Sequence, residues 1–247
     1  MKFYLLASGS KGNCCVIENR NSRIVIDCGT TKKYLTQCLN EINIPLNSLQ
    51  GMLITHNHSD HIKQLKMFRS IPTYSEFELD VEEQVLIQAN QVFDISSLKI
   101  QSIRLSHDAS CLGYIIQDEA SKLVYITDTG YLKEEYYEVL ANADYYIFES
   151  NHDVEMLMKT QRPSYVKQRI INDYGHLCNE DCAKHLGQLI GNNTKQVVLA
   201  HISEEGNTRQ QAIDVLENQL KMKQIARDQL TIMAAPQFEI TRGGQDD

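Results

Sequence analysis

Short apolar runs and helix-period segments alternate along the chain, and turn residues separate them. Apolar or β-branched runs bounded by Gly, Asn or Pro predict strands, while apolar residues three and four positions apart predict helices. In the first half these patterns predict strands over Phe3–Ala7, Cys14–Glu18, Arg23–Ile26, Met52–Ile54 and Pro72–Tyr74, and helices over Thr30–Asn43, His61–Phe68 and Val81–Ala89. The first three strands are consecutive, so they predict an antiparallel meander.

The second half repeats this alternation. It predicts strands over Lys99–Leu105, Leu112–Gln117, Leu123–Thr127, Asp144–Phe148 and Gln196–Ala200, helices over Leu132–Leu140 and Arg209–Leu220, and two last strands. Residues 152–190 have helical spacing in three pieces that Pro163 and Gly175 interrupt. Two sheets packed between helices, of the α/β (α+β) class, fit this order. No linker or repeat marks a boundary, so one domain over residues 1–242 with a flexible tail over 243–247 is expected.

Composition narrows the class of protein. A hydrophobic share of 42% in 247 residues is enough for a core. Lys plus Arg number 24 and Asp plus Glu 32, a net charge of −8, which excludes a uniformly basic nucleic-acid coat. No apolar stretch approaches the roughly 18 residues of a membrane helix, so a soluble cytoplasmic protein without membrane contact is expected. The cysteines form no C-x-x-C pair, which predicts reduced, mostly buried thiols.

A dense cluster of metal-binding side chains follows the predicted strand at Met52–Ile54. The segment Thr55-His56-Asn57-His58-Ser59-Asp60-His61 holds three imidazoles and a carboxylate. In an extended loop His56 and His58 project to the same side, while Asp60 and His61 can begin the next helix and point back. Such a loop can supply ligands to two metal ions. A solvated His-rich turn is disfavoured, because uncompensated imidazoles at a strand end are costly to gather.

Further candidate ligands follow later predicted strands. His107, Asp128 and His201 each come directly after an apolar run. One such residue alone is more often an ordinary loop histidine or turn aspartate, but three in matching strand-end positions favour a common site. Asp27 ends the run Ile24–Ile26 and is expected to orient a ligand through a hydrogen bond. A set of nitrogen and oxygen ligands of this kind suits Zn²⁺, Mn²⁺ or iron.

These residues in this order resemble the five motifs of the metallo-β-lactamase fold, over nearly the whole chain. Four secondary motifs are similar to those of the YycJ/WalJ proteins: Ser8-Gly9-Ser10-Lys11-Gly12-Asn13, Thr127-Asp128-Thr129-Gly130, Glu149-Ser150-Asn151-His152-Asp153, and Gly175-His176-Leu177 followed by Asn179. Where similar proteins usually have Ser after Gly-His-Leu, this chain has Cys178, which weakens a catalytic role at that position. No β-CASP-like segment is inserted between Asp128 and His201, which disfavours nucleases of long RNA that depend on it.

The resemblance implies a four-layer αββα metallo-β-lactamase sandwich with two divalent metal ions at one edge. By that resemblance one ion takes His56, His58 and His107, the other takes Asp60, His61 and His201, and Asp128 bridges them. Two such ions hold a shared water as hydroxide and polarise a phosphoryl oxygen. Proteins of this type are regarded as bacterial cytoplasmic nucleases. The resemblance therefore implies a 5′-to-3′ DNA exonuclease whose partner is nucleic acid, DNA with 5′-phosphorylated ends.

Proton transfer needs further residues. Asp60 can orient the hydroxide or accept a proton as general base. His176 with Glu149 is the candidate general acid with its orienting partner, and His152 is the rival for the acid. For both histidines a helix-capping or ligand-orienting role is open.

The Ser8–Asn13 loop and a basic stretch are candidates for substrate binding. Ser8, Ser10 and Asn13 offer polar groups beside two glycines, and the loop is equally compatible with a phosphate nest and with a tight hairpin turn. The basic stretch contains Lys159, Arg162, Lys167 and Arg169 together with Tyr165, and it could line the approach to the site. A solvated helix face is the alternative for this stretch, since isolated charge groups usually only solubilise.

Two other functions stay open from the sequence alone. The same ligand set on this fold also hydrolyses thioesters and lactams, so a small-molecule hydrolase of the glyoxalase II type, or one acting on a small phosphodiester, is an alternative that the secondary motifs disfavour. The other is a metal-loaded regulatory binding module, although closed structural sites usually use Cys and His without a bridging carboxylate. No pattern in the sequence predicts the oligomeric state.

Overall fold

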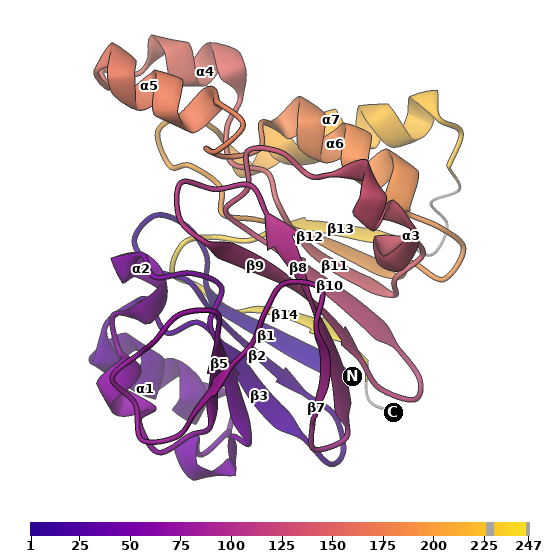
Figure 1. Ribbon diagram of the computed structural model, residues 1–247. Helices are drawn as coiled ribbons and strands as arrows, with labels where there is room; N and C mark the ends of the chain where they lie inside the picture. The colour runs from indigo at the N-terminus through magenta and orange to yellow at the C-terminus, as the bar shows by residue number, and fades with distance from the viewer. Residues whose placement is uncertain (226–229, 246–247) are drawn as a thin grey trace.

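Two mixed β-sheets lie face to face in the computed structural model, which describes residues 1–225 and 230–245 (Figure 1). Within these residues each sheet has seven strands. The first sheet has the order β14 (Thr241–Gly244), β1 (Lys2–Ala7), β2 (Cys14–Glu18), β3 (Arg23–Ile26), β4 (Gly51–Leu53), β5 (Thr73–Ser75) and β6 (Gln84–Leu86). The second has the order β13 (Thr231–Ala234), β12 (Gln196–Ala200), β11 (Tyr145–Glu149), β10 (Lys122–Ile126), β9 (Cys111–Gln117), β8 (Leu98–Leu105) and β7 (Val92–Ile95).

The two sheets have the same pattern of strand directions. In the first sheet the pairs from β14 to β3 are antiparallel and those from β3 to β6 are parallel. In the second sheet the pairs from β7 to β10 are antiparallel and those from β10 to β13 are parallel. Neighbouring parallel strands have their carboxyl ends at one edge, where open α/β sheets place their functional loops. The strand-end loops of the two sheets meet, and Leu112 N donates to Thr55 O at 2.9 Å across the seam.

Helices cover the outer face of each sheet (Figure 1). Those beside the first sheet are α1 (Lys32–Glu41) and α2 (Ser59–Ile62), with short 3₁₀ turns at Leu46–Ser48 and Leu65–Met67. Those over the second sheet are α3 (Tyr137–Leu140), preceded by a 3₁₀ turn at Glu134–Tyr136, α6 (Asn179–Leu189) and α7 (Arg209–Met222). The pair α4 (Val154–Lys159) and α5 (Ser164–Ile171) projects beyond the second sheet, at the top of Figure 1.

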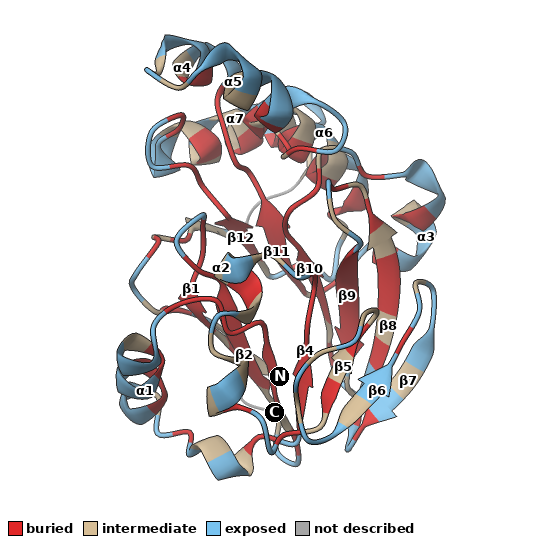
Figure 2. Cartoon of the chain, turned by 60° about the vertical axis from the view of Figure 1, so that its left-hand side comes forward, coloured by how far each residue is buried: buried red, intermediate tan, exposed pale blue. Residues whose placement is uncertain are grey.

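The buried side chains form three apolar clusters, one between each pair of layers. Phe3, Tyr114 and Tyr125 are almost fully buried in the cluster between the two sheets. A second cluster lies between the second sheet and its helices, and a third packs α1 against the first sheet. Figure 2 shows the sheet strands buried along most of their length, while α1, α4 and α5 keep an exposed face. The predicted four-layer αββα sandwich is confirmed.

Two features of the sequence prediction fail at the sheet edges. The helix expected over Val81–Ala89 is wrong, because this segment contains β6, where Val85 and Leu86 are 42% and 57% exposed. Their apolar pattern therefore does not arise from a buried helix face. Gly243 and Gly244, expected in a loose tail, instead belong to β14 and pair with Phe3 and Lys2. Glycine is required there because a Cβ at Gly243 would lie 2.1 Å from the Phe3 ring. Residues 246–247 of the expected tail lie outside the described residues.

Two simpler expectations concern the thiols and the membrane. All seven cysteines are unbridged and six of them are buried, so the expectation of mostly buried cysteines is confirmed. In residues 1–225 and 230–245, no helix combines the length and the apolar character needed to cross a bilayer.

Candidate metal centre

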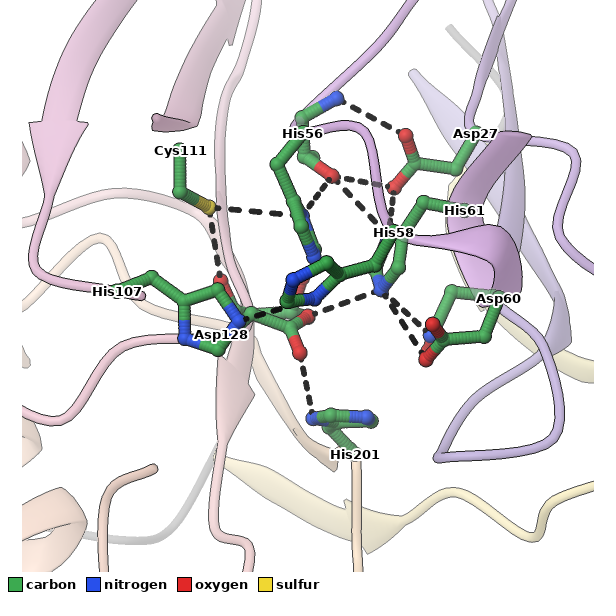
Figure 3. A network of polar contacts seen from close by, with 12 residues as sticks. Asp27, His56, His58, Asp60, His61, His107, Cys111, Asp128 and His201 are labelled. Atoms are coloured by element: carbon green, nitrogen blue, oxygen red, sulfur yellow. Dashed lines mark hydrogen bonds and ion pairs between the residues drawn. The ribbon is translucent and has the colours of Figure 1, made fainter. Parts of the chain in front are cut away.

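Three strand-end residues share a left-handed backbone conformation. Asp27 follows β3, Asp128 follows the end of β10 and His201 follows β12, with φ values of 60°, 60° and 52°. This conformation is strained for a residue with a side chain and persists where the surrounding structure enforces it, typically at functional sites. Figure 3 shows Asp27 directed toward His61, and Asp128 and His201 directed toward each other. The strained turns therefore bring side chains from both sheets to one seam.

The loop after β4 carries the clustered histidines. His58 is the N-cap residue of α2, and Asp60 and His61 lie within that helix. The Ser8–Asn13 loop supports the turn, because Asn13 N donates to Asp60 O at 2.8 Å. The backbone at Gly29 passes so close that a Cβ there would lie 1.4 Å from Asp60 O. Close backbone packing therefore fixes where the loop presents its imidazoles.

The predicted ligands form overlapping groups whose ligand atoms lie within 4.8 Å of one another. In the described part of the chain these groups are His56, His58 and His107; His56, His61 and Asp128; and Asp128, Glu149, His176 and His201. His58 Nδ1 lies 3.4 Å from His107 Nε2, and Asp128 Oδ2 lies 3.3 Å from His61 Nε2 (Figure 3). Asp60 is outside these groups, with its Oδ2 3.7 Å from His61 Nε2. Asp128 and His56 each belong to two of these groups and so connect all three. Together the groups contain every predicted histidine ligand.

Polar atoms at the centre of this cluster are buried without a hydrogen-bond partner among the described residues. They are His56 Nε2, His201 Nε2 and Asp128 Oδ2. A buried polar atom without a partner costs roughly 1–3 kcal/mol of stability, so each one needs an explanation. Imidazole nitrogen and carboxylate oxygen are the ligand atoms that Zn²⁺, Mn²⁺ and iron take in proteins. The residues present therefore fit divalent metal ions.

The second nitrogen of the histidines is held by polar partners. His61 Nδ1 lies 2.7 Å from Asp27 Oδ2, and His201 Nδ1 lies 2.9 Å from Glu149 Oε1. His107 Nδ1 lies 3.2 Å from the carbonyl oxygen of Gly175. When Nδ1 donates to such an acceptor, Nε2 keeps its lone pair and can bind a metal ion. These contacts leave Nε2 of His61 and His107 directed toward the cluster, whereas His201 has its Nδ1 3.3 Å from Asp128 Oδ1.

Asp27 is the acceptor that the sequence led us to expect. Its two carboxylate oxygens accept from Thr55 N at 2.9 Å and Thr55 Oγ1 at 2.8 Å, in addition to the contact with His61. Complete burial raises the pKa of Asp27, and the neighbouring His61 and Thr55 oppose that rise. Thr55 is a residue that the sequence analysis missed, although it directly precedes His56.

The cluster opens into a cavity of about 250 Å³. His58, Asp60, His107, Asp128, His176 and His201 all line it. A larger cavity of about 500 Å³ lies between the start of α7 and the β13–β14 connection, and none of the predicted site residues lines it. The smaller cavity is therefore the candidate reaction site, because it contains the histidines and carboxylates.

Comparisons with known proteins agree with this geometry. A family profile described as the Beta-lactamase superfamily domain matches residues 22–202. Exodeoxyribonuclease YycJ of Bacillus anthracis is 32% identical over 227 residues, which cover 86% of both chains. Exodeoxyribonuclease WalJ of Streptococcus pneumoniae is 34% identical over 237 residues, covering 89% of this chain and 88% of that protein. The chain belongs to the YycJ/WalJ family of the beta-lactamase superfamily.

A solved structure supports the fold of this family member. The metallo-beta-lactamase fold protein YhfI of Bacillus subtilis superposes with a TM-score of 0.71 at 15% sequence identity, covering 97% of this chain and 98% of that one. At this identity the match concerns the arrangement of the elements. It agrees with the αββα sandwich described above.

Glu149 lies between two histidines in this YycJ/WalJ family member. Fully buried at the end of β11, its Oε1 lies 2.7 Å from His176 Nδ1 and 2.9 Å from His201 Nδ1, while Oε2 accepts from Thr129 N. Burial alone would raise the pKa of Glu149, but the charge of His176 and the hydrogen bonds from both histidines lower it to about 2. Burial would lower the pKa of His201, but Asp128 and Glu149 raise it to about 9. Without a metal ion, Glu149 and His201 are therefore a buried ion pair.

The metal-free protein should lose stability at both ends of the pH range. The pKa of Glu149 falls from 4.5 to about 2, so its contribution is complete above pH 4.5 and is lost as the pH falls toward 2. The pKa of His201 rises from 6.5 to about 9, so its contribution is complete below pH 6.5 and is lost as the pH rises through 9. Thermal unfolding in a chelator should therefore give the highest Tm between these two limits.

Glu149→Gln should weaken the loss of Tm at both low and high pH. It removes the carboxyl group that titrates at low pH and one hydrogen-bond partner of His201. Glu155→Gln is the matched control, since Glu155 pairs with Lys159 on the surface of α4 at 3.4 Å. Its pH profile should follow that of the wild type. An unchanged profile in Glu149→Gln would contradict the assignment.

His176 and His152, the two candidates for the acid, differ in position. His176 lines the metal cavity with a side chain that is 21% exposed. His152 is buried, does not line that cavity, and has no hydrogen-bond partner for Nδ1 among the described residues. Burial lowers the pKa of His152 to about 4, so this ring is neutral near pH 7. The geometry therefore favours His176 as the acid.

The three polar residues of the Ser8–Asn13 loop have different surroundings. Ser8 Oγ accepts from His201 N at 2.7 Å, and Asn13 Nδ2 lies 2.9 Å from His61 Nε2. Ser10 lines the metal cavity. Gly12 N also donates to Gly9 O, which closes a turn within the loop. Ser8 and Asn13 therefore contact metal-ligand candidates, and Ser10 is the residue of the three that lines the cavity.

The sequence analysis also missed Asp108 and Cys111. Asp108 Oδ1 lies 3.3 Å from His107 Nε2 and 3.4 Å from His58 Nε2, while its Oδ2 accepts from Arg169 Nε at 2.7 Å. Its position directly after His107, in a strand-end loop, was the available signal. Cys111 Sγ lies 3.7 Å from His56 Nδ1. Burial raises the pKa of the Cys111 thiol well above its usual value.

Several residues of the other motifs have structural contacts. Cys178 is the N-cap of α6, where its Sγ accepts from Asp181 N at 3.4 Å, so helix capping explains this position. Lys167 Nζ donates to Met158 O and Thr160 O at the end of α4, at 2.7 and 2.8 Å. Of the basic residues in the stretch, Arg162 and Arg169 line the metal cavity.

Proposed function

We propose that this chain is a dinuclear-metal-dependent phosphodiesterase that acts as a 5′-to-3′ exodeoxyribonuclease. The observation that carries the proposal is the set of His and Asp side chains at facing strand ends. Within it, His56 Nε2, His201 Nε2 and Asp128 Oδ2 are buried without a hydrogen-bond partner among the described residues. The two relatives named exodeoxyribonucleases, each similar over most of its length, support DNA as the substrate.

The proposed ligands come from both sheets. His56, His58 and His107 would hold one ion, Asp60, His61 and His201 the other, and Asp128 would lie between them. The short contacts of Asp128 with His61 and His201, 3.3 Å each, support its central place. Two divalent ions in this position lower the pKa of a water molecule and polarise a phosphoryl oxygen. Since the ligands belong to both sheets, we also propose that the two sheets, including β14, act as one domain.

The chain's own residues would position the water and move the protons. The Asp60 carboxylate, 26% exposed at the cavity, orients the attacking water and accepts its proton. His176 donates a proton from Nε2 to the leaving 3′-oxygen as the phosphorus–oxygen bond breaks. Glu149, which the low pKa keeps ionised, holds His176 Nδ1 at 2.7 Å and stabilises the charged ring before transfer.

Digestion of end-labelled duplex DNA tests the proposal. The metal-reconstituted protein should release mononucleotides from ends that carry a 5′-phosphate, and His58→Ala should be inactive, because it removes a ligand of the first proposed ion. Zn²⁺, Mn²⁺ and iron are to be compared in separate reconstitutions. Turnover of a thioester or of a small phosphodiester, with no cleavage of DNA or RNA, would show that the substrate assignment is wrong.

His176→Gln tests the acid in the same assay. We expect kcat to fall by about 10²–10⁴-fold, the usual contribution of a positioned acid, while the bound metal stays at the wild-type amount. His152→Gln serves as the comparison, since His152 lies outside the cavity. A larger loss of kcat in His152→Gln than in His176→Gln would reverse the assignment.

A further inference from the structure

Arg162 and Glu205 form an ion pair at the rim of the metal cavity. Arg162 lies between α4 and α5 and lines the same cavity as His58 and Asp60. Its Nε donates to Glu205 Oε2 at 2.9 Å. The Arg162 side chain is 28% exposed and that of Glu205 is 60% exposed. A carboxylate that lies largely in solvent therefore holds a guanidinium beside the site.

Glu205 differs from the other carboxylate that pairs with an arginine of this cavity. In the described part of the chain, Glu205 has Arg162 as its hydrogen-bond and ion-pair partner and no other. Asp108, the partner of Arg169, lies within 3.4 Å of both His58 and His107. An exposed ion pair contributes little stability and exchanges easily. The contact of Arg162 can therefore be broken without moving a candidate metal ligand.

Two other cations nearby lack one of these two features, an exchangeable partner or a place in the cavity lining. Lys167 closes the end of α4 through two carbonyl oxygens. Lys11 pairs with Glu204 and does not line the metal cavity. Among the described residues, Arg162 is consequently the cation that both lines the cavity and has an exchangeable partner.

We propose that Arg162 binds a non-scissile phosphate of the substrate and that Glu205 occupies the guanidinium until the substrate arrives. The proposal rests on the proposed function, because the phosphate belongs to a nucleic acid whose neighbouring phosphate reacts at the metal centre. A guanidinium matches phosphate oxygens with two parallel hydrogen bonds and a full charge. The contact with Glu205 holds the guanidinium at the rim of the cavity until a phosphate replaces the carboxylate.

Opposite effects of two substitutions test this exchange. Arg162→Ala should raise KM for DNA roughly tenfold with kcat within about twofold of wild type, and it should reduce the slope of log affinity against log salt by about 1. Glu205→Gln should lower KM by roughly two- to fivefold, because the substrate no longer displaces a carboxylate. If the ion pair had only a structural role, both substitutions would instead raise KM for DNA.

The chain offers a matched control pair. Arg242 Nη2 lies 2.7 Å from Glu41 Oε1 in an exposed ion pair, and neither residue lines the metal cavity. Arg242→Ala and Glu41→Gln cause the same changes in net charge as the two test variants. Both controls should leave KM and the salt dependence at the wild-type values. Arg162→Lys keeps the positive charge but removes the guanidinium. It should therefore keep the wild-type salt slope and lose part of the affinity that Arg162→Ala loses.

Substrates with and without a 5′-phosphate identify which phosphate Arg162 binds. A loss of affinity confined to 5′-phosphorylated DNA assigns the terminal phosphate, and an equal loss on both substrates assigns an internal phosphodiester.

The same variants are compared by binding of a fluorescent oligonucleotide in a chelator, where no hydrolysis occurs. If the wild-type protein cuts no DNA, the proposed function is wrong. Weaker oligonucleotide binding by Arg162→Ala and tighter binding by Glu205→Gln would still support the phosphate site. Shifts of both variants in one direction, or no shift in either, would overturn the inference.

Discussion

Replacing Asp128 with Asn should lower kcat for phosphodiester hydrolysis by about 10³-fold or more. Asp128 Oδ2 is buried without a hydrogen-bond partner, and the carboxylate lies 3.3 Å from both His61 and His201. An amide has the same shape but no negative charge to place between two cations. We therefore expect loss of bound metal together with loss of activity, measured by metal analysis and steady-state kinetics.

The control for this substitution is Asp144→Asn. Asp144 precedes β11 and pairs with Lys195 at 2.9 Å, away from the metal cavity. This control should keep both the metal content and kcat within about twofold, because Asp144 is not among the residues that line the metal cavity. An Asp128→Asn protein with two bound ions and full activity would show that the bridging assignment is wrong.

A methyl group at position 29 should be the most damaging small change outside the ligands. The Cβ of Gly29→Ala would lie 1.4 Å from Asp60 O and 2.6 Å from His61 N, and these are backbone atoms that no side-chain rotation can move away. The turn that carries His58, Asp60 and His61 must shift, and we expect a loss of at least about 3 kcal/mol in the free energy of unfolding. Urea denaturation measures that loss, and titration with Zn²⁺ measures the accompanying loss of metal affinity.

Gly206→Ala provides the comparison. Gly206 is also buried, but the nearest atoms to its Cβ would be those of Leu157 at 3.4 Å, an ordinary contact. Its stability should change by no more than about 1 kcal/mol. Equal effects of the two substitutions would show that the close approach at Gly29 does not support the metal centre.

The candidate ligands could be found in the sequence because each signal was local. His107, Asp128 and His201 lie within two residues of the ends of the apolar strands β8, β10 and β12. For Asp128 and His201 these strands belong to the parallel part of the sheet, whose carboxyl ends lie at one edge. The dual contact of Glu149 with His176 and His201 could not be found in this way. It depends on how β11, β12 and the segment before α6 pack, and no short pattern encodes that packing.

The misplaced elements have a different physical origin. Some apolar residues of Val81–Ala89 are exposed on the edge strand β6. Their spacing is therefore helical without marking the buried face of a helix. Strand β7, which the sequence analysis did not predict, is likewise an edge strand, and its Val92 is 50% exposed. Patterning arguments depend on burial, and they are weakest where a sheet meets solvent.

The order of the proposed ligands along the chain bears on how the protein matures during translation. Synthesis proceeds from the amino terminus, so the ribosome releases His56–His61, which follow a strand of the first sheet, well before His107, Asp128 and His201 of the second. Until His201 has emerged and both sheets have paired, the early histidines can give an ion only part of its ligand set. A half-made chain consequently lacks part of the proposed ligand set, and the complete set forms only late in synthesis.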